Sequence, residues 1–488
     1  MIKPSLRTLL PPDLLLLDPS VGEAFYRQIY LRFRNAIADR LLKPGDRIPS
    51  ARALAEELGV ARGTVEAAYS LLTAEGYVET RGQAGTIVTL GLEPGAQATP
   101  AMRDRAVAAP AAGLPMLPPT LLPIPQPMPF QMGLPALDAF PRKIWSRLAA
   151  RSIRATAPGD MIYPPQAGVA ALRREIATYL QLSRGVACTP AQVFVTAGYR
   201  ETLQLIAGAL LKPGDKVWTE DPGYQPTGQV LMQAGMIPVS VPVDGEGIQV
   251  ALGVQEAPRA RAAIVTPAHQ SPLCVSLSLQ RRFALLDWAA RANAWIVEDD
   301  YDGEYRYVGR PLPALKSLDR DGRVLYAGTF SKVLFPGIRL AYLVVPESQI
   351  ERFAAVGQAM FSGSPALTQS IVSDFIAEGH FARHVQRMRK LYGERRKIAA
   401  DGLDGLLGKY LRVDPQPGGM HLILRVRGGR SDKALAAAMR KDGMSVHALS
   451  QRAVRYQTPP ALLLSFTNID SAATIEALGR RILKLVDA

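Results

Sequence analysis

The chain has 488 residues and a net charge of +14, and 48% of its residues are hydrophobic. This length exceeds what one hydrophobic core normally holds, so we expect two or three domains. The two cysteines, Cys188 and Cys274, argue against a disulfide framework and favour the reducing cytoplasm.

The positive charge indicates either an anionic partner such as DNA or a generally basic surface. Residues 1–88 hold 11 basic and 10 acidic residues, whereas residues 129–488 hold 44 and 31. The excess therefore lies mainly in the larger C-terminal part, which we expect to help attract nucleic acid if DNA is the partner.

Residues 20–88 predict three helices followed by a hairpin. The segment 25–42 has apolar residues four apart, and Ser50 and Gly59 are a good N-cap and stop for a second helix. From Ala61 to about Ala74, apolar residues recur at helical spacing. The short turn between these two helices predicts a helix-turn-helix, and the β-rich ends around Gly82 and Gly85 predict a wing.

Residues 89–128 are rich in proline and alanine, and we interpret them as a linker. Residues 106–137 carry no charge, but each of their recurring prolines removes a backbone donor that lipid cannot replace. We therefore expect no membrane span, and the prolines in "LLPPDLLLLD" argue against a secretory signal.

From residue 129 the chain alternates helices with short apolar runs such as "QVFVTAG", "RAAIVTPAH" and "RVLYAGTFSK". This pattern predicts an α/β domain with a parallel sheet that is covered on both faces. Beyond Pro346 we expect a smaller α+β subdomain. The polar residues gather at the carboxyl ends of the strands, where such sheets bind ligands.

The segment "GTFSKVLFPGIRLAYLV" places Lys332 just after an apolar strand. A lysine that forms an imine must lose its proton, and the aldehyde that it attacks must be held in place beside it. Thr329 and Arg339 supply a hydroxyl and a guanidinium that suit a phosphate. The segment predicts a site for pyridoxal 5'-phosphate (PLP).

Three other segments supply the remaining groups for this cofactor. Asp299 ends a strand where a carboxylate can keep a pyridinium nitrogen protonated, and Tyr301 can reach the phenolic oxygen. Tyr224 can stack on the ring. A strand, a small-residue turn and a helix predict a phosphate cradle from three amides, those of Ala197, Gly198 and Tyr199.

Each signal alone has a simpler explanation. A lysine after a strand is usually a surface cation, and "EDDYDGE" is usually a solvated loop or, alternatively, a metal site. The order of the segments across one α/β domain favours the cofactor, and we expect no metal.

Residues 129–488 resemble fold-type I PLP enzymes of the aspartate aminotransferase kind, through "TAG", "EDPGY", "EDDYDGE" and "TFSK" followed by arginine. Residues 20–88 resemble the GntR winged-helix family. The combination resembles the MocR/GabR family of PLP-binding transcription regulators. It implies an N-terminal winged helix-turn-helix and a C-terminal α/β aminotransferase-like domain with a smaller α+β subdomain.

The resemblance implies that Lys332 holds PLP as an imine and that Asp299 and Tyr301 bind the pyridine nitrogen and the phenolic oxygen. It also assigns Thr329 and Arg339 to the phosphate. Tyr163 matches a tyrosine that reaches the phosphate of the neighbouring subunit, so a homodimer would complete each site. The alternative for Tyr163 is an ordinary half-buried aromatic.

Two features depart from aminotransferases. Gln270 and Ser271 stand where these enzymes carry the asparagine of an "NP" motif. The arginine that grips the substrate carboxylate is absent from "TPPALLLSFTNID". Arg452 or Arg455 could substitute from the adjacent loop, and efficient transamination is in doubt without such a group.

The winged-helix resemblance places Ala61 to Ala74 in the major groove of DNA. We expect the DNA-contacting residues to be Arg52 on the preceding helix, Arg62 and Thr64 on the recognition helix, and Arg81 and Gly82 at the wing tip. The alternative for Arg62 is an i, i+4 ion pair with Glu66. The run Arg383–Lys397 is a basic patch or a solvated helix face.

We therefore expect a cytoplasmic transcription regulator that binds an operator in double-stranded DNA and uses PLP as a sensor. Either an amine or amino-acid effector, or PLP itself, would alter operator binding. The alternatives are a working aminotransferase tethered by its N-terminal domain, and a DNA-binding protein with an inactive cofactor domain. We expect no physiological turnover, although a residual half-reaction is compatible with the site.

Overall fold

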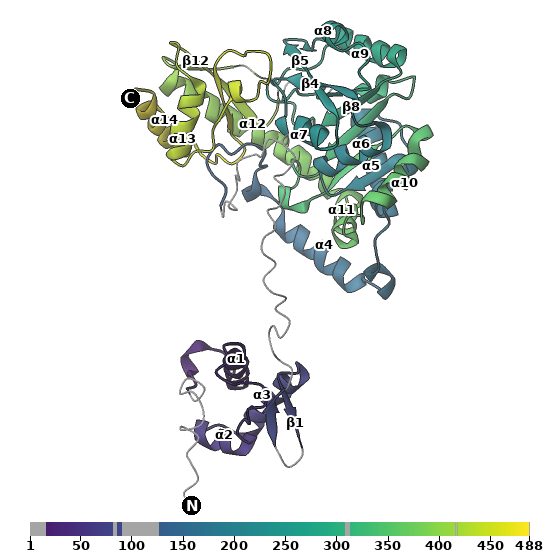
Figure 1. Cartoon of the computed structure of the whole chain (residues 1–488). Coiled ribbons are helices and arrows are strands. Elements are labelled where there is room, and N and C mark those ends of the chain that lie inside the picture. Colours follow the sequence, from purple (N-terminus) through teal and green to yellow (C-terminus); the bar gives the residue numbers. More distant parts are fainter. Residues whose placement is uncertain are drawn as a thin grey trace, which may run out of the picture. The chain divides into compact units, whose positions relative to one another are not determined.

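The computed structural model describes residues 16–81, 85–89, 126–307, 313–414, 416 and 418–487. The chain divides into two compact units, residues 1–114 and residues 115–488 (Figure 1). Most of the predicted linker 89–128 and the predicted wing residue Gly82 lie outside the described residues. None of the helices described is long and apolar enough to cross a membrane.

The first unit has the predicted helix-turn-helix and wing. Its elements are η3 (Pro19–Val21), α1 (Phe25–Ala38), α2 (Ala51–Leu58), α3 (Arg62–Ala74), β1 (Val78–Thr80) and β2 (Thr86–Val88). The strands β1 and β2 pair antiparallel. The apolar face of α3 is buried in a core shared by all three helices, formed on α3 by Val65, Ala68, Tyr69 and Leu72.

Helix α2, which lies between α1 and α3 in the sequence, has the predicted capping residues. The Ser50 hydroxyl accepts a hydrogen bond from the Ala53 amide at 3.2 Å, and Gly59 ends α2 with φ of 64°. The Tyr69 hydroxyl donates to the Pro49 carbonyl at 3.0 Å, which ties α3 to the residue before this cap. These local signals explain why the boundaries of α2 were predictable.

The second unit is built on a sheet of eight strands in the order β3-β10-β9-β8-β7-β4-β5-β6. The strands are β3 (Val193–Thr196), β4 (Lys216–Asp221), β5 (Ile237–Asp244), β6 (Gly247–Ile248), β7 (Ala262–Val265), β8 (Trp295–Asp300), β9 (Val324–Thr329) and β10 (Ala341–Val344). The prediction of a parallel sheet was incomplete, because β10 runs antiparallel to β3 and β9, and β6 runs antiparallel to β5.

Helices cover both faces of this sheet. Alternate residues of β3 show this, because Val193 and Val195 belong to one core and Phe194 belongs to another. The helices are α4 (Arg142–Ala155), α5 (Ala170–Arg184), α6 (Tyr199–Leu210), α7 (Gln225–Gln233), α8 (Val250–Glu256), α9 (Leu279–Ala292), α10 (Ile350–Met360) and α11 (Ala366–Ala377). The short 3₁₀ turns are η5 (Leu137–Ala139), η6 (Pro158–Met161), η7 (Pro190–Gln192), η8 (Leu315–Leu318), η9 (Pro336–Ile338) and η10 (Glu347–Gln349).

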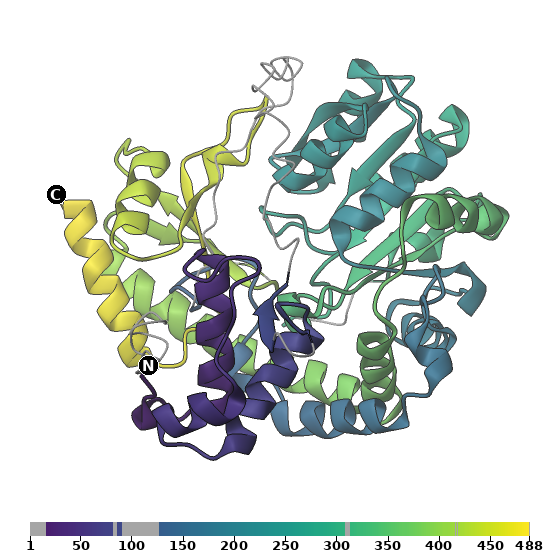
Figure 2. The ribbon, with the colours of Figure 1, turned by 60° about the horizontal axis from the view of Figure 1, so that its bottom comes forward.

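A smaller subdomain lies beside this sheet in both views (Figures 1 and 2). It contains the antiparallel sheet β11-β12-β14-β13 and the helices that cover it. Its elements are α12 (His380–Leu407), β11 (Leu411–Val413), β12 (His421–Val426), α13 (Asp432–Lys441), β13 (His447–Ala448), η11 (Leu449–Gln451), β14 (Ala461–Ser465) and α14 (Ala472–Asp487). Its boundary differs from the prediction at Pro346, because α10 and α11 pack on the large sheet.

We predict that Ser50→Ala lowers the stability of α2 by about 1 kcal/mol, because the Ala53 amide loses its acceptor. Hydrogen exchange of the α2 amides in the full-length protein should then accelerate about fivefold. Ser50→Gly is the matched control, because glycine at an N-cap costs only a few tenths of a kcal/mol. Equal exchange in both variants would contradict the capping role.

Candidate cofactor site and DNA-binding helix

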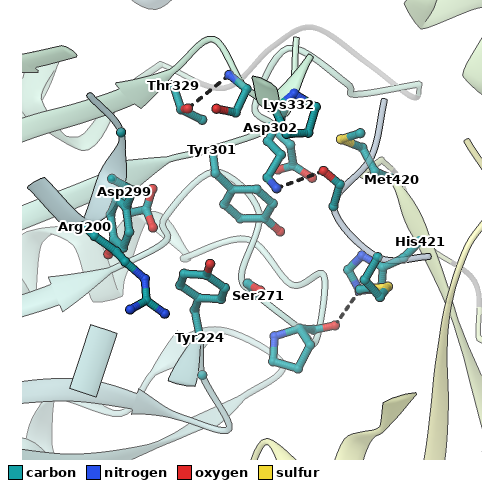
Figure 3. Close-up of a pocket in the computed structure, with 18 of the residues that line it drawn as sticks. Arg200, Tyr224, Ser271, Asp299, Tyr301, Asp302, Thr329, Lys332, Met420 and His421 are labelled. Carbon is teal, nitrogen blue, oxygen red and sulfur yellow. Dashed lines mark hydrogen bonds between the residues drawn. The ribbon is translucent and has the colours of Figure 1, made fainter. Parts of the chain in front are cut away.

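A cavity of about 380 Å³ lies at the carboxyl ends of β8 and β9, with residues of the smaller subdomain on its wall. This volume is within the range of small-molecule sites. Figure 3 shows Asp299, Tyr301, Thr329 and Lys332 around this space. The cavity also contains the predicted residues Gly198, Tyr199, Tyr224 and Arg339 in its wall.

Lys332 reaches the cavity from the turn after β9. Its Nζ donates a hydrogen bond to the Gly133 carbonyl at 2.9 Å. Burial lowers the pKa of this amine, and the charges of Asp302 and Asp299 only partly oppose that effect. Gly133 has φ of 78°, and a β-carbon there would lie 2.7 Å from Nζ. The structure therefore keeps space beside a lysine whose proton is held less firmly than in water.

Asp299 is the penultimate residue of β8, and its carboxyl group is buried. Burial raises its pKa to about 8, the Tyr199 hydroxyl opposes this shift, and the charges of neighbouring acidic residues add to it. It forms no ion pair within the described part of the chain. A protonatable nitrogen is the natural partner for such a carboxyl group.

Tyr301 stands beside the same space. Its hydroxyl lies 3.2 Å from His269 Nδ1, and that ring also pairs with Asp302 at 3.1 Å. Burial raises the pKa of Tyr301 well above its ordinary value, so the hydroxyl keeps its proton and can donate it in a hydrogen bond.

The predicted phosphate cradle lies between the N-terminus of α6 and the segment that carries Arg339 after Lys332. Gly198 is the N-cap of α6 with φ of 125°, and a β-carbon there would lie 3.5 Å from the Arg339 guanidinium. The guanidinium of Arg339 makes no hydrogen bond or ion pair among the described residues. A guanidinium beside the positive end of a helix is unfavourable unless an anion lies between them.

Other hydroxyl groups border this cradle. Thr329 and Ser331 line the cavity, and Thr329 Oγ1 accepts a hydrogen bond from the Ser331 amide at 3.1 Å. Ala197 differs from its prediction, because it is not in the cavity wall and its amide donates to Glu201 Oε1 at 3.1 Å. Of the three residues predicted for the cradle, Gly198 and Tyr199 therefore line the cavity and Ala197 does not.

The aromatic residues divide between the cavity and the surface. The rings of Tyr199 and Tyr224 lie 5.9 Å apart on the wall, and the Tyr199 hydroxyl bonds to Thr227 at 3.1 Å. Tyr163 is not in the cavity of its own chain and is 87% exposed, beside the exposed residues Met161 and Ile162. The chain alone thus leaves open the role predicted for Tyr163.

These residues fit PLP. The site combines a buried amine, a cation-free carboxyl group and a helix N-terminus with a facing arginine, which match an aldehyde, a pyridine nitrogen and a phosphate. The fit comes from groups that would otherwise be poorly satisfied.

Gln270 and Ser271, which replace the "NP" asparagine, have separate roles. Gln270 is buried, and its Nε2 donates to Glu220 Oε2 and to the carbonyls of Pro222 and Ser271, at 3.1, 2.9 and 2.8 Å. Ser271 lines the cavity. Gln270 therefore holds the two loops together, and Ser271 borders the cavity.

The two arginines that could replace the carboxylate-binding residue also differ. Arg452 lines the cavity, whereas Arg455 points outward to Glu256 with distances of 2.7 and 3.1 Å. Leu463 of β14 contributes an apolar wall. The sequence could not separate the two arginines, because both lie in an irregular loop.

Sequence reasoning missed several lining residues. Gly133 is 199 positions from the lysine that it contacts, so no local pattern connects them. His421 and His447 come from strands of the smaller subdomain. Asp302 could have been predicted from the sequence, because it lies in the same acidic run as Asp299.

In the first unit, the predicted DNA-contacting residues lie outside the core. Arg52 on α2 is exposed, and Thr64 on α3 is half-buried. Arg62 Nε pairs with Glu66 at 2.7 Å, as the alternative predicted, and Arg81 pairs with Glu79 at 2.7 Å. Exposed pairs of this kind contribute little, so they leave both arginines able to contact DNA.

The basic run Arg383–Lys397 lies within α12, and it is neither a plain patch nor a fully solvated face. Arg395 is buried and pairs with Asp138, and Arg389 Nε donates to the Glu304 carbonyl at 3.0 Å. These side chains therefore join α12 to the rest of the unit.

Comparison with known proteins covers both units. Residues 25–88 match the family described as bacterial regulatory proteins, gntR family, and residues 136–480 match aminotransferase class I and II. The chain is 36% identical to the probable rhizopine catabolism regulatory protein MocR of Rhizobium meliloti, over 96% of this chain and 94% of that protein. It is 34% identical to the HTH-type pyridoxine biosynthesis transcriptional regulator PdxR of Corynebacterium glutamicum, over 89% and 90%.

Among solved structures, an archaeal alanine:glyoxylate aminotransferase matches with a TM-score of 0.68 and 27% identity, covering 74% of this chain and 91% of that one. The two-part resemblance predicted from the motifs is thereby confirmed, and so is the aminotransferase fold of the second unit.

We predict that Asp299 makes the stability of the cofactor-free protein fall as pH rises. Its pKa is about 8 in the folded chain against an ordinary 3.8, so between these values the folded state binds a proton that the unfolded state releases. This contribution is complete below about pH 4 and is lost through pH 8. From pH 5 to pH 8, wild type should lose on the order of a few kcal/mol relative to Asp299→Asn.

Urea unfolding can be followed by tryptophan fluorescence, because all four tryptophans lie in the second unit. The exposed Asp401→Asn is the matched control and should keep the wild-type slope. Parallel pH profiles for wild type and Asp299→Asn would show that the Asp299 carboxyl is ionised in the folded protein.

Proposed function

Because the chain belongs to the MocR/GabR family, which joins a GntR winged helix to an aminotransferase-like domain, we propose that its PLP site senses an amine and alters operator affinity. The chain is a PLP-dependent, DNA-binding transcription regulator. The observation that carries the proposal is the presence, in one chain, of a cavity whose residues fit PLP and of a winged helix.

Different residues of the cavity would bind different groups of the cofactor. Lys332 Nζ would hold the aldehyde carbon, Asp299 would share a proton with the ring nitrogen, and Tyr301 would donate to the phenolic oxygen. Arg339 and the first turn of α6 would bind the phosphate. When bound, PLP supplies an aldehyde that condenses with primary amines.

The protein's own groups prepare this chemistry. Burial favours the neutral form of Lys332, which is the form that attacks a carbonyl carbon. The raised pKa of Asp299 keeps a proton on its carboxyl at neutral pH, ready for a basic nitrogen. An amine that competes with Lys332 would remove the tether between the ligand and β9.

Sensing is better supported than turnover. The wall formed by β14 presents Leu463 instead of a carboxylate-binding arginine, and a loosely oriented substrate reacts slowly. A regulator needs only a difference in ligand affinity between two states, and it needs no catalytic cycle.

At the DNA end, α3 would enter the major groove with Arg62 and Thr64 at its exposed N-terminus. Arg52 and Arg81 would contact the backbone or the neighbouring groove. We propose that the protein acts in the cytoplasm, where it would reach its DNA operator.

A second copy of the chain would complete each cofactor site. The neighbouring side chains of Met161, Ile162 and Tyr163 are 74%, 72% and 87% exposed, and a run of large exposed apolar residues favours burial in an interface. The Tyr163 hydroxyl would then donate a hydrogen bond to the phosphate held by the partner subunit.

We predict that the two activities separate by mutation. Lys332→Ala should prevent borohydride from fixing PLP to the chain, while operator binding without effector persists. Arg62→Ala should weaken operator binding about 10- to 100-fold, because a base or phosphate contact is lost, while PLP absorbance is retained. The operator is selected from random DNA by the full-length protein, and binding is measured by anisotropy at fixed salt.

Glu66→Gln is the matched control for Arg62, because it frees the guanidinium from its intrahelical pair. It should leave operator binding unchanged or tighten it. Equal damage to both activities by Lys332→Ala and Arg62→Ala would contradict separate modules.

We predict that Tyr163→Phe weakens PLP binding about tenfold or more, because a hydrogen bond to a charged phosphate is lost. Its own Lys332 is intact, so mixing it with Lys332→Ala should restore one native site in each mixed dimer. PLP affinity of the mixture is measured by equilibrium dialysis. Wild-type affinity in Tyr163→Phe alone would contradict a shared site.

A further inference from the structure

The hydroxyl of Tyr301 borders the cavity and also contacts a buried pair, His269 and Asp302. His269 lies in the loop after β7, and Asp302 follows β8. His269 Nδ1 lies 3.2 and 3.1 Å from the two carboxylate oxygens of Asp302 and 3.2 Å from the Tyr301 hydroxyl. One ring nitrogen therefore contacts three oxygen atoms, and it has at most one proton to donate to them.

The carboxylate of Asp302 determines the direction of these hydrogen bonds. A bare Nδ1 would turn its lone pair toward two carboxylate oxygens, which also have only lone pairs to offer. Burial favours the neutral ring, but the charge of Asp302 outweighs this effect and holds the pKa of His269 well above its ordinary value. Nδ1 carries a proton both in the charged ring and in the neutral form that suits a carboxylate. Nδ1 is therefore the donor, and the Tyr301 oxygen is the acceptor.

The smaller subdomain fixes the orientation of the His269 ring. Gly419, two residues before β12, has φ of 88°, and a β-carbon there would lie 2.0 Å from Cε1 of the ring and 2.6 Å from Nε2. The Gly419 amide donates to the Tyr305 carbonyl at 2.8 Å, and its carbonyl accepts a hydrogen bond from the Tyr307 hydroxyl. This backbone is thus held against the ring, and Nδ1 stays on the side of Asp302 and Tyr301.

Ser271 is the other hydroxyl beside Tyr301, and Figure 3 shows both at the cavity. Burial raises the pKa of Tyr301 well above its ordinary value, and the hydrogen bond with Ser271 opposes this shift. A bond that favours the ionised form of a tyrosine is one that its oxygen accepts. Ser271 therefore acts in the same sense as His269. With both contacts donated to the oxygen, the proton of Tyr301 is left to point into the cavity.

We propose that His269 and Asp302 are positioning residues that direct the Tyr301 proton into the cavity, so that this point of the site favours a ligand with a hydrogen-bond acceptor. The proposal rests on the proposed function, because the matching acceptor is the phenolic oxygen of PLP. A ligand without an acceptor there would leave a buried hydroxyl unsatisfied, which is costly. Both residues act through Tyr301.

The test compares PLP with its deoxy analogue, which lacks the phenolic oxygen, on full-length protein. Equilibrium dialysis gives the two dissociation constants, and their ratio is the preference for PLP. Tyr301→Phe should lower this preference about tenfold or more. His269→Leu should lower it about threefold to tenfold, because the hydrogen-bonded chain that polarises Tyr301 is broken. His269→Asn should stay within about twofold of wild type, because its amide can donate from the position of Nδ1.

The sign of the effect distinguishes the two directions of the hydrogen bond. If Tyr301 donates to His269 instead, His269→Leu frees the proton and raises the preference for PLP, which would overturn the inference. His380→Leu is the matched control, because His380 also pairs with a carboxylate, that of Glu378, at 3.1 Å but lies outside the cavity wall. It should keep the wild-type preference.

A second measurement uses cofactor-free, full-length wild type with isotope-labelled histidine rings. Nitrogen NMR separates a protonated ring nitrogen from a bare one, and the loss of one signal in His269→Asn identifies His269 among the five histidines. We expect a protonated Nδ1, and a bare Nδ1 would overturn the inference. This measurement does not require His269→Leu to fold.

The outcomes separate the inference from the proposed function. If wild type binds neither PLP nor its analogue, the proposed function fails, whereas the ring signal of His269 still decides the direction of the hydrogen bond. If PLP binds but His269→Leu keeps or raises the preference, the inference is overturned and regulation by PLP remains. An equal loss in His380→Leu overturns it as well.

Discussion

The carboxyl group of Asp299 is buried without a cation, and the cofactor site depends on this constraint. Its acidic neighbours have partners: Glu298 accepts bonds from backbone amides, Asp300 pairs with a buried arginine, and Asp302 pairs with a histidine. In the described chain Asp299 has no such pair, so burial raises its pKa to about 8. The end of β8 therefore has one position that a basic nitrogen can occupy without displacing a protein contact.

The opposite charge pattern marks the other end of the site. Arg339 lies beside the N-terminus of α6, so two positive features face each other across Gly198. A ligand with a basic nitrogen at one end and an anion at the other satisfies both ends at once. The amine of Lys332, on the turn after β9, would then determine where the reactive carbon of such a ligand lies. The sheet edge would therefore set the orientation of the ligand as well as its place.

Much of this was predictable because the signals are local. Caps at Ser50 and Gly59 define α2, and the motif residues at the carboxyl ends of strands meet in one cavity because neighbouring strands end there. The antiparallel direction of β10 and the presence of β5 were not predicted, since strand direction leaves no local pattern and β5 contains Pro238 and Pro242. The inward turn of Arg452 depends on a carboxylate more than 230 residues away, which no spacing rule reveals.

That distant contact also joins one wall of the cavity to the large sheet. The carboxylate of Asp221 accepts hydrogen bonds from the amides of residues 454–456 and so joins the large sheet to the loop of the smaller subdomain. Arg452 therefore faces the cavity only while the two are attached. A ligand of this cavity would shift the equilibrium between the attached and a detached arrangement only if it bound one of the two more tightly. The part of the cavity wall that the smaller subdomain supplies therefore depends on the contacts of one aspartate.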